Sequence, residues 1–88
     1  MGFIMFAMSI SQIVSGFSGT TNYNIIVRIG NAEKHFTPET ITKHKATFVF
    51  VKPENVLTQY DFKTNTTTYT FICEDTPAMR HMMEKFMD

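Results

Sequence analysis

The strongest sign of chemistry in this sequence is a cysteine, a histidine and a methionine that lie close together near its end. Cys73, His81 and Met82 occur in that order within YTFICEDTPAMRHMMEKFMD, residues 69–88. A blue-copper site uses a cysteine thiolate, histidine nitrogens and a weak axial methionine that converge on one ion. The order of these residues suggests such a site, provided that the elements carrying them let the three side chains meet.

The residues between Cys73 and His81 instead predict the start of a helix. Thr76 is a favourable N-cap, and Pro77 suits the first helical position. The apolar residues that follow recur at steps of three and four, as on one helix face: Met79, Met82, Met83, Phe86 and Met87. A helix would turn His81 toward solvent and away from Cys73. We therefore predict a C-terminal amphipathic helix over 76–88, with no metal and no other cofactor.

No other group of residues has a spacing that suggests catalysis. His35, His44 and His81 are too far apart in the sequence for a metal-ligand pattern. The four glycines are scattered and form no phosphate-binding loop. Cys73 alternates with Phe71 in an apolar segment, which predicts a buried and inert thiol. We predict no catalytic residues and no enzyme activity.

Length and composition predict one small globular domain. The 88 residues are the length of a single domain, 1–88, and the hydrophobic fraction of 43% is sufficient for a core. The net charge is zero, so we expect no nucleic-acid partner. The single cysteine excludes an internal disulfide framework and fits a reducing compartment, which favours a cytoplasmic protein.

Residues 1–19 form an uncharged apolar segment. Its apolar residues recur at helical spacing, but several also alternate with smaller residues, so both a helix and a strand fit. The apolar run is too short and too interrupted to span a bilayer, and we expect no transmembrane segment. The alternative is a cleaved secretory signal over 1–16, which would make the protein secreted. Asn65-Thr66-Thr67 is a glycosylation acceptor pattern, although threonine-rich turns produce such matches by chance.

Residues 20–75 predict an antiparallel β-meander of about five strands. Residues 23–29 alternate like a half-buried strand, and Gly30-Asn31 suits the tight turn to a returning strand. Residues 46–51, ATFVFV, are apolar on both faces, which predicts a central strand. NVLTQYDF and TTYTFICE predict two further strands, joined across residues 63–65. Because the connections are short, neighbouring strands should be antiparallel.

These elements predict an α+β fold, a small antiparallel meander capped by the C-terminal helix. Thr37 is a suitable N-cap and Pro38 suits the first helical position, which predicts at most a short helical turn. Residues 47–88 read TFVFVKPENVLTQYDFKTNTTTYTFICEDTPAMRHMMEKFMD. A last strand that runs straight into one amphipathic helix resembles the closing half of pleckstrin-homology-like domains, including phosphotyrosine-binding types. The resemblance implies a short roll and a non-catalytic module that binds a peptide, a phosphoinositide or another protein.

The first functional hypothesis is a non-enzymatic protein-interaction module or a subunit of a larger assembly. A small domain has difficulty burying a charge-free apolar segment on itself, and exposed apolar patches tend to be interfaces. The partner would be another protein chain or a second copy in a homodimer. The residues expected at this interface are Phe3, Phe6, Ile10, Ile13 and Phe17.

The second hypothesis is a module that binds an anionic ligand, such as a lipid headgroup or a peptide. Residues 28–52 carry five basic and two acidic side chains, a net charge of +3. The basic residues expected to contact the ligand are Arg28, Lys34, Lys43, Lys45 and Lys52. Binding through these side chains should weaken as salt concentration rises.

Overall fold

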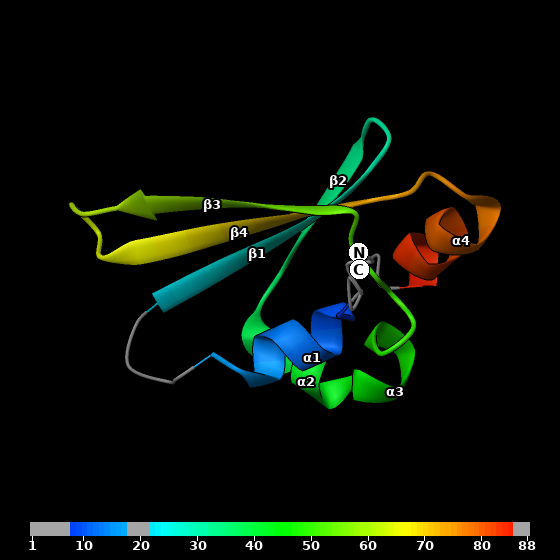
Figure 1. Cartoon of the computed structure of the whole chain (residues 1–88), viewed down its shortest axis with the longest axis horizontal. Coiled ribbons are helices and arrows are strands. Elements are labelled where there is room, and N and C mark those ends of the chain that lie inside the picture. The colour runs from blue at the N-terminus through cyan, green and yellow to red at the C-terminus, as the bar shows by residue number, and fades with distance from the viewer. Residues whose placement is uncertain (1–7, 18–21, 86–88) are drawn as a thin grey trace, which may run out of the picture.

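Figure 1 shows the computed structural model of the chain, and the structure describes residues 8–17 and 22–85. The elements, in chain order, are α1 (Ile10–Ser15), β1 (Asn22–Ile29), β2 (Ala32–Phe36), α2 (Pro38–Lys43), α3 (Lys45–Phe48), β3 (Asn55–Asp61), β4 (Thr66–Cys73) and α4 (Pro77–Lys85). The fold is α+β, as the sequence predicted. None of the helices within the described residues is long and apolar enough to cross a membrane.

Within the described residues, four strands form one mixed sheet in the order β2-β1-β4-β3. β1 pairs antiparallel with β2 and parallel with β4, and β4 pairs antiparallel with β3. The prediction of a five-stranded antiparallel meander over 20–75 is therefore wrong. β1 and β4 can be parallel because the chain between them passes through β2, α2, α3 and β3, a connection long enough to cross over.

Two predicted hairpins are confirmed. Gly30 follows β1 with φ 60°, a conformation that costs glycine little, and β2 returns antiparallel to β1. β3 returns as β4 with Leu57 opposite Thr70. Asn65 lies directly before β4 with φ 52°, and asparagine is one of the few other residues that adopt this region.

The prediction of a central strand over 46–51 is wrong. α3 ends at Phe48, and a turn leads from it to Val51. Phe48 and Val51 are buried whereas Phe50 is 77% exposed, which is the three-residue step of a helical turn and not the alternation of a strand. A short apolar run fits either element, and tertiary contacts decide. Here the Val51 carbonyl accepts a hydrogen bond from the Ile10 N–H at 2.8 Å.

The core lies between the sheet and the helices. α1, α2 and α3 lie together on one side of the sheet, and α4 lies near the end where β1 turns into β2 (Figure 1). In the parallel pair of β1 and β4, residues that lie opposite each other point to the same face of the sheet. Val27 and its partner Phe71 therefore both point toward the helices. The hydrophobic residues that are 0% exposed are Ile10, Ile25, Val27, Ile29, Ile41, Phe48 and Phe71.

Part of the apolar N-terminal segment is a helix that packs onto this core. α1 begins with a capping box, in which the Ser9 hydroxyl accepts the Gln12 N–H at 3.2 Å and the Gln12 side chain accepts the Ser9 N–H at 2.8 Å. Ile10 is fully buried, so it has no surface to offer a partner. Ile13 and Phe17 pack against the core. Two further residues of the predicted interface, Phe3 and Phe6, lie outside the described residues.

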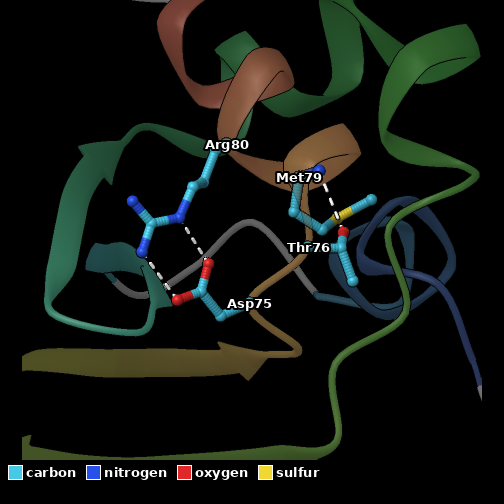
Figure 2. Close-up of polar contacts among 4 residues, drawn as sticks. All are labelled: Asp75, Thr76, Met79 and Arg80. Carbon is cyan, nitrogen blue, oxygen red and sulfur yellow. Dashed lines mark hydrogen bonds and ion pairs between the residues drawn. The ribbon is translucent and has the colours of Figure 1, made fainter.

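The predicted C-terminal helix is confirmed as α4, and Figure 2 shows how it begins. The Met79 N–H donates to the Thr76 hydroxyl at 3.2 Å, which makes Thr76 the N-cap. Met82 and Met83 are buried, and His81 is exposed, as the helical spacing predicted. The last apolar residues of the predicted stripe, Phe86 and Met87, lie beyond the part of the chain that the structure describes.

Candidate functional site

The structure separates Cys73 from His81. Cys73 ends β4 and is buried, whereas His81 lies on the exposed side of α4. Burial raises the pKa of the Cys73 thiol to about 11, and the nearby carboxylate of Glu54 adds to the shift. Across residues 8–17 and 22–85 there is no group of three or more histidine, cysteine, aspartate or glutamate side chains that could hold a metal ion.

We expect Cys73 to react with iodoacetamide at pH 8 about a hundredfold more slowly in the native chain than in the unfolded chain. A rise of the pKa from 9.0 to about 11 lowers the thiolate fraction at this pH about a hundredfold, and the thiolate is the nucleophile. Mass spectrometry of timed samples with and without urea measures both rates, since the chain has one cysteine. Equal rates would mean that the thiol is accessible in the fold.

Asp75, in the loop before α4, forms an ion pair with Arg80 of α4 and also lies close to Gly30 in the β1–β2 turn. Figure 2 shows Asp75 and Arg80 facing each other, with N–O distances of 2.5 and 2.7 Å. The hydrogen bond from Arg80 lowers the pKa of the Asp75 carboxyl, and the charge of the guanidinium lowers it further. A Cβ added to Gly30 would lie 2.6 Å from the Asp75 Oδ2, so this carboxylate fits directly over the turn.

Of the five basic residues predicted to contact an anion, the structure brings Lys34 and Lys43 into one pocket. Arg28 instead forms an ion pair with Glu33 across the β1–β2 hairpin, with an N–O distance of 2.9 Å. Lys45 and Lys52 do not line this pocket. Lys85, at the end of α4, lines it, although sequence analysis did not select this residue.

This basic pocket lies between β2, α2 and α4 and has a volume of about 540 Å³. Pockets of about 300–1,000 Å³ are typical of small-molecule sites. Its lining residues are Lys34, His35, Phe36, Thr37, Thr40, Lys43, His44 and Lys85. Among the described residues that line it there are three lysines and no carboxylate, so the pocket is strongly cationic.

Lys34 is the most unusual group in the basic pocket. It lies opposite Val27 in the β1–β2 pair, which puts its side chain on the face that the helices cover. Its Nζ atom is buried and has no hydrogen-bond partner among the described residues. The ring of Phe36 lies near it, with its centroid 6.0 Å from Nζ. A buried ammonium without a hydrogen-bond partner destabilises a fold, which makes its presence here informative.

The start of α2 contributes hydroxyl groups to the basic pocket. Thr37 is the N-cap of this helix, as the sequence predicted, and its hydroxyl oxygen accepts the Thr40 N–H at 3.2 Å. The two threonine hydroxyl oxygens lie 3.0 Å apart. A hydrogen bond between them uses one of their two protons, so the other proton remains to be donated to a ligand.

The outer edge of β3 is a second candidate surface. In the described part of the sheet β3 pairs with β4 alone and has an open edge on its other side. Every residue of Asn55–Asp61 is exposed. The large hydrophobic side chains on it are Val56, Leu57, Tyr60 and Phe62, which are 36%, 43%, 59% and 77% exposed. We call residues 55–62 the β3 edge; much of the β3–β4 hairpin extends beyond the helices (Figure 1).

Sequence analysis predicted the strand but not its use as a surface. The signal was present in NVLTQYDF, which puts apolar residues on both faces of a strand and carries one charge. Comparison of the chain with protein-family models, with curated proteins and with solved structures gives no match. The functional argument therefore depends on the geometry of these two surfaces.

Proposed function

We propose that this chain is a protein-interaction module that pairs with a second copy of itself along the β3 edge. The observation that carries the proposal is the exposure of all seven residues of β3 at an open side of the sheet. An edge strand presents unpaired backbone N–H and C=O groups. A strand added from another chain supplies partners for these groups.

The two edges of the described sheet differ in how well they are protected against such pairing. β2 has five residues, and Glu33, Lys34 and His35 occupy its middle. Charged side chains on a short strand discourage the addition of another strand. β3 is longer, contains neither lysine nor proline, and carries its single charge at Asp61, where the strand ends. Strand addition is therefore favoured at β3.

A second copy fits the β3 edge in an antiparallel arrangement centred on Thr58. Val56 of one copy then lies opposite Tyr60 of the other on one face of the sheet. Pairs of an aromatic and a β-branched residue across strands contribute roughly 0.2–1 kcal/mol each. Asp61 lies opposite Asn55, so like charges do not meet. The contact is the same on both chains, as in a two-fold homodimer.

The test is the mass of the full chain, measured by light scattering over a dilution series. We expect a dimer with twice the 10.1 kDa of one chain, and Thr58→Lys should weaken its association at least tenfold. Thr58 is exposed, and the substitution would put two lysines opposite each other at the centre of the pair.

Thr64→Lys is the matched control, because it adds the same charge at an exposed position of the turn after β3. This variant should remain dimeric. A wild-type chain that stays monomeric at its highest attainable concentration would contradict the proposal. So would a Thr58→Lys variant that associates as tightly as the wild type.

A further inference from the structure

We propose that the basic pocket binds the phosphate monoester group of a small molecule. The proposal is independent of self-association at the β3 edge, because none of the described residues that line the pocket belongs to β3. An experiment can therefore contradict one of the two proposals without affecting the other.

Lysines from three elements converge on the pocket. Lys34 comes from β2, Lys43 ends α2 and Lys85 ends α4. A lysine in the last turn of a helix is common, since it interacts favourably with the helix carbonyl groups. Lys43 and Lys85 therefore do not identify a site by themselves. Their presence in one pocket with Lys34, whose ammonium is buried without a hydrogen-bond partner among the described residues, does.

Lysine side chains normally extend so that the ammonium reaches water while the aliphatic stem is covered. Lys34 does the reverse, because the side chain is half-buried and its Nζ atom is fully buried. It also lines a neighbouring pocket that contains Glu33 and Glu84. The ion pairs among the described residues are formed by Arg28 and Arg80, so neither glutamate pairs with Lys34. Because its Nζ atom is covered in this structure, the side chain must turn toward the pocket before its three N–H donors can reach a ligand. No hydrogen bond to a described residue opposes this movement.

The number of donors and charges fits a phosphate monoester better than a carboxylate. A phosphate monoester carries about −1.5 to −2 charges at pH 7 and three strong acceptor oxygens. Three ammonium groups and the spare hydroxyl proton of the Thr37–Thr40 pair supply a matching set of donors. A volume of about 540 Å³ leaves room for an organic group attached to the phosphate. A soluble sugar phosphate and the headgroup of a phosphoinositide share this chemistry.

The test is a titration of the full chain at constant ionic strength, followed by amide chemical shifts in nuclear magnetic resonance. The probes are inorganic phosphate, glucose 6-phosphate, inositol trisphosphate and acetate. We expect saturable shifts at the amides of Thr37, Thr40 and Lys43 with the phosphates, and at least tenfold weaker binding of acetate. Vesicles that contain a phosphoinositide distinguish the sources, since a soluble ligand predicts no vesicle binding and a headgroup predicts it.

Two variants should remove the site, and a third is the matched control. Lys34→Met and Lys43→Gln should each weaken phosphate binding at least tenfold. Lys63→Gln removes the same charge from the exposed turn between β3 and β4, and should leave binding unchanged. The absence of saturable shifts would overturn the proposal, and so would equal losses in all three variants, which would indicate a general effect of net charge.

Thermal unfolding gives an independent measurement of the role of Lys34. Without phosphate, Lys34→Met should raise the Tm, because methionine replaces a buried ammonium that has no hydrogen-bond partner among the described residues. Phosphate should raise the Tm of the wild type, since a ligand that binds the native state stabilises it, but not that of Lys34→Met. A lower Tm of Lys34→Met without phosphate would show that the ammonium has a structural partner and would overturn its assignment to a ligand.

Discussion

Replacing Phe48 by alanine should lower the free energy of unfolding by about 3–5 kcal/mol, whereas Phe50→Ala should change it by less than about 0.5 kcal/mol. Phe48 is 0% exposed, and its ring packs edge-on against that of Phe36 with centroids 5.4 Å apart. Phe50 is 77% exposed. Urea denaturation of the two variants measures the difference.

The pair of variants also tests the corrected structure of residues 46–51. In a strand, Phe48 and Phe50 would point to the same face, and both substitutions would destabilise a buried face equally. Equal and large losses would therefore support the strand and contradict α3. Domains of this length have a total stability of roughly 4–13 kcal/mol, so Phe48→Ala can leave too little folded protein to measure. Phe48→Leu is then the milder substitution at the same site.

Gly30→Ala should lower the free energy of unfolding by about 2 kcal/mol, mainly because alanine is disfavoured at φ 60° by roughly 1–2 kcal/mol. The new Cβ would also lie 2.6 Å from the Asp75 Oδ2, so the carboxylate would have to move. If that contact contributes, the cost of Gly30→Ala should be smaller in an Asp75→Ala background. Urea denaturation of the single and double variants gives this coupling.

Gly16→Ala is the control for the loss of a glycine. Gly16 has φ −84°, and a Cβ there would meet its nearest neighbour at 3.4 Å, which is an ordinary contact. Alanine at such a position should be neutral or stabilising by up to about 1 kcal/mol. Similar losses at Gly16 and Gly30 would contradict the assignment of a special turn conformation to Gly30.

Sequence analysis was reliable where the signal is local. The alternation of 23–29, the turn at Gly30 and the N-caps Thr37 and Thr76 all depend on neighbouring residues, and the structure contains each of them. The parallel β1–β4 pair could not be predicted in the same way, because no local pattern shows which distant strands meet. The resemblance to pleckstrin-homology-like domains stays a prediction.

The difference between local signals and contacts of distant segments also applies to the candidate sites. Lys34 and Lys43 could be selected because they lie in one basic region of the sequence. Lys85 could not, since its place in the basic pocket depends on how α4 packs near β2. The ion pair between Arg28 and Glu33 could have been foreseen, because a tight turn at Gly30-Asn31 puts Glu33 directly opposite Arg28. Ile10, which was predicted at an interface, is part of the core instead, because α1 packs against the sheet.

The parallel pairing at the centre of the sheet determines when this protein can finish folding during its synthesis. Ile25 pairs with Tyr69, more than forty residues further along the chain. The β1–β2 hairpin and the first three helices are synthesised before β4, so one edge of β1 lacks its partner until β4 has been made. Contacts between such distant segments form slowly, because a long loop must be closed first. β4 should therefore complete the core in a late step, once the β3–β4 hairpin docks against β1.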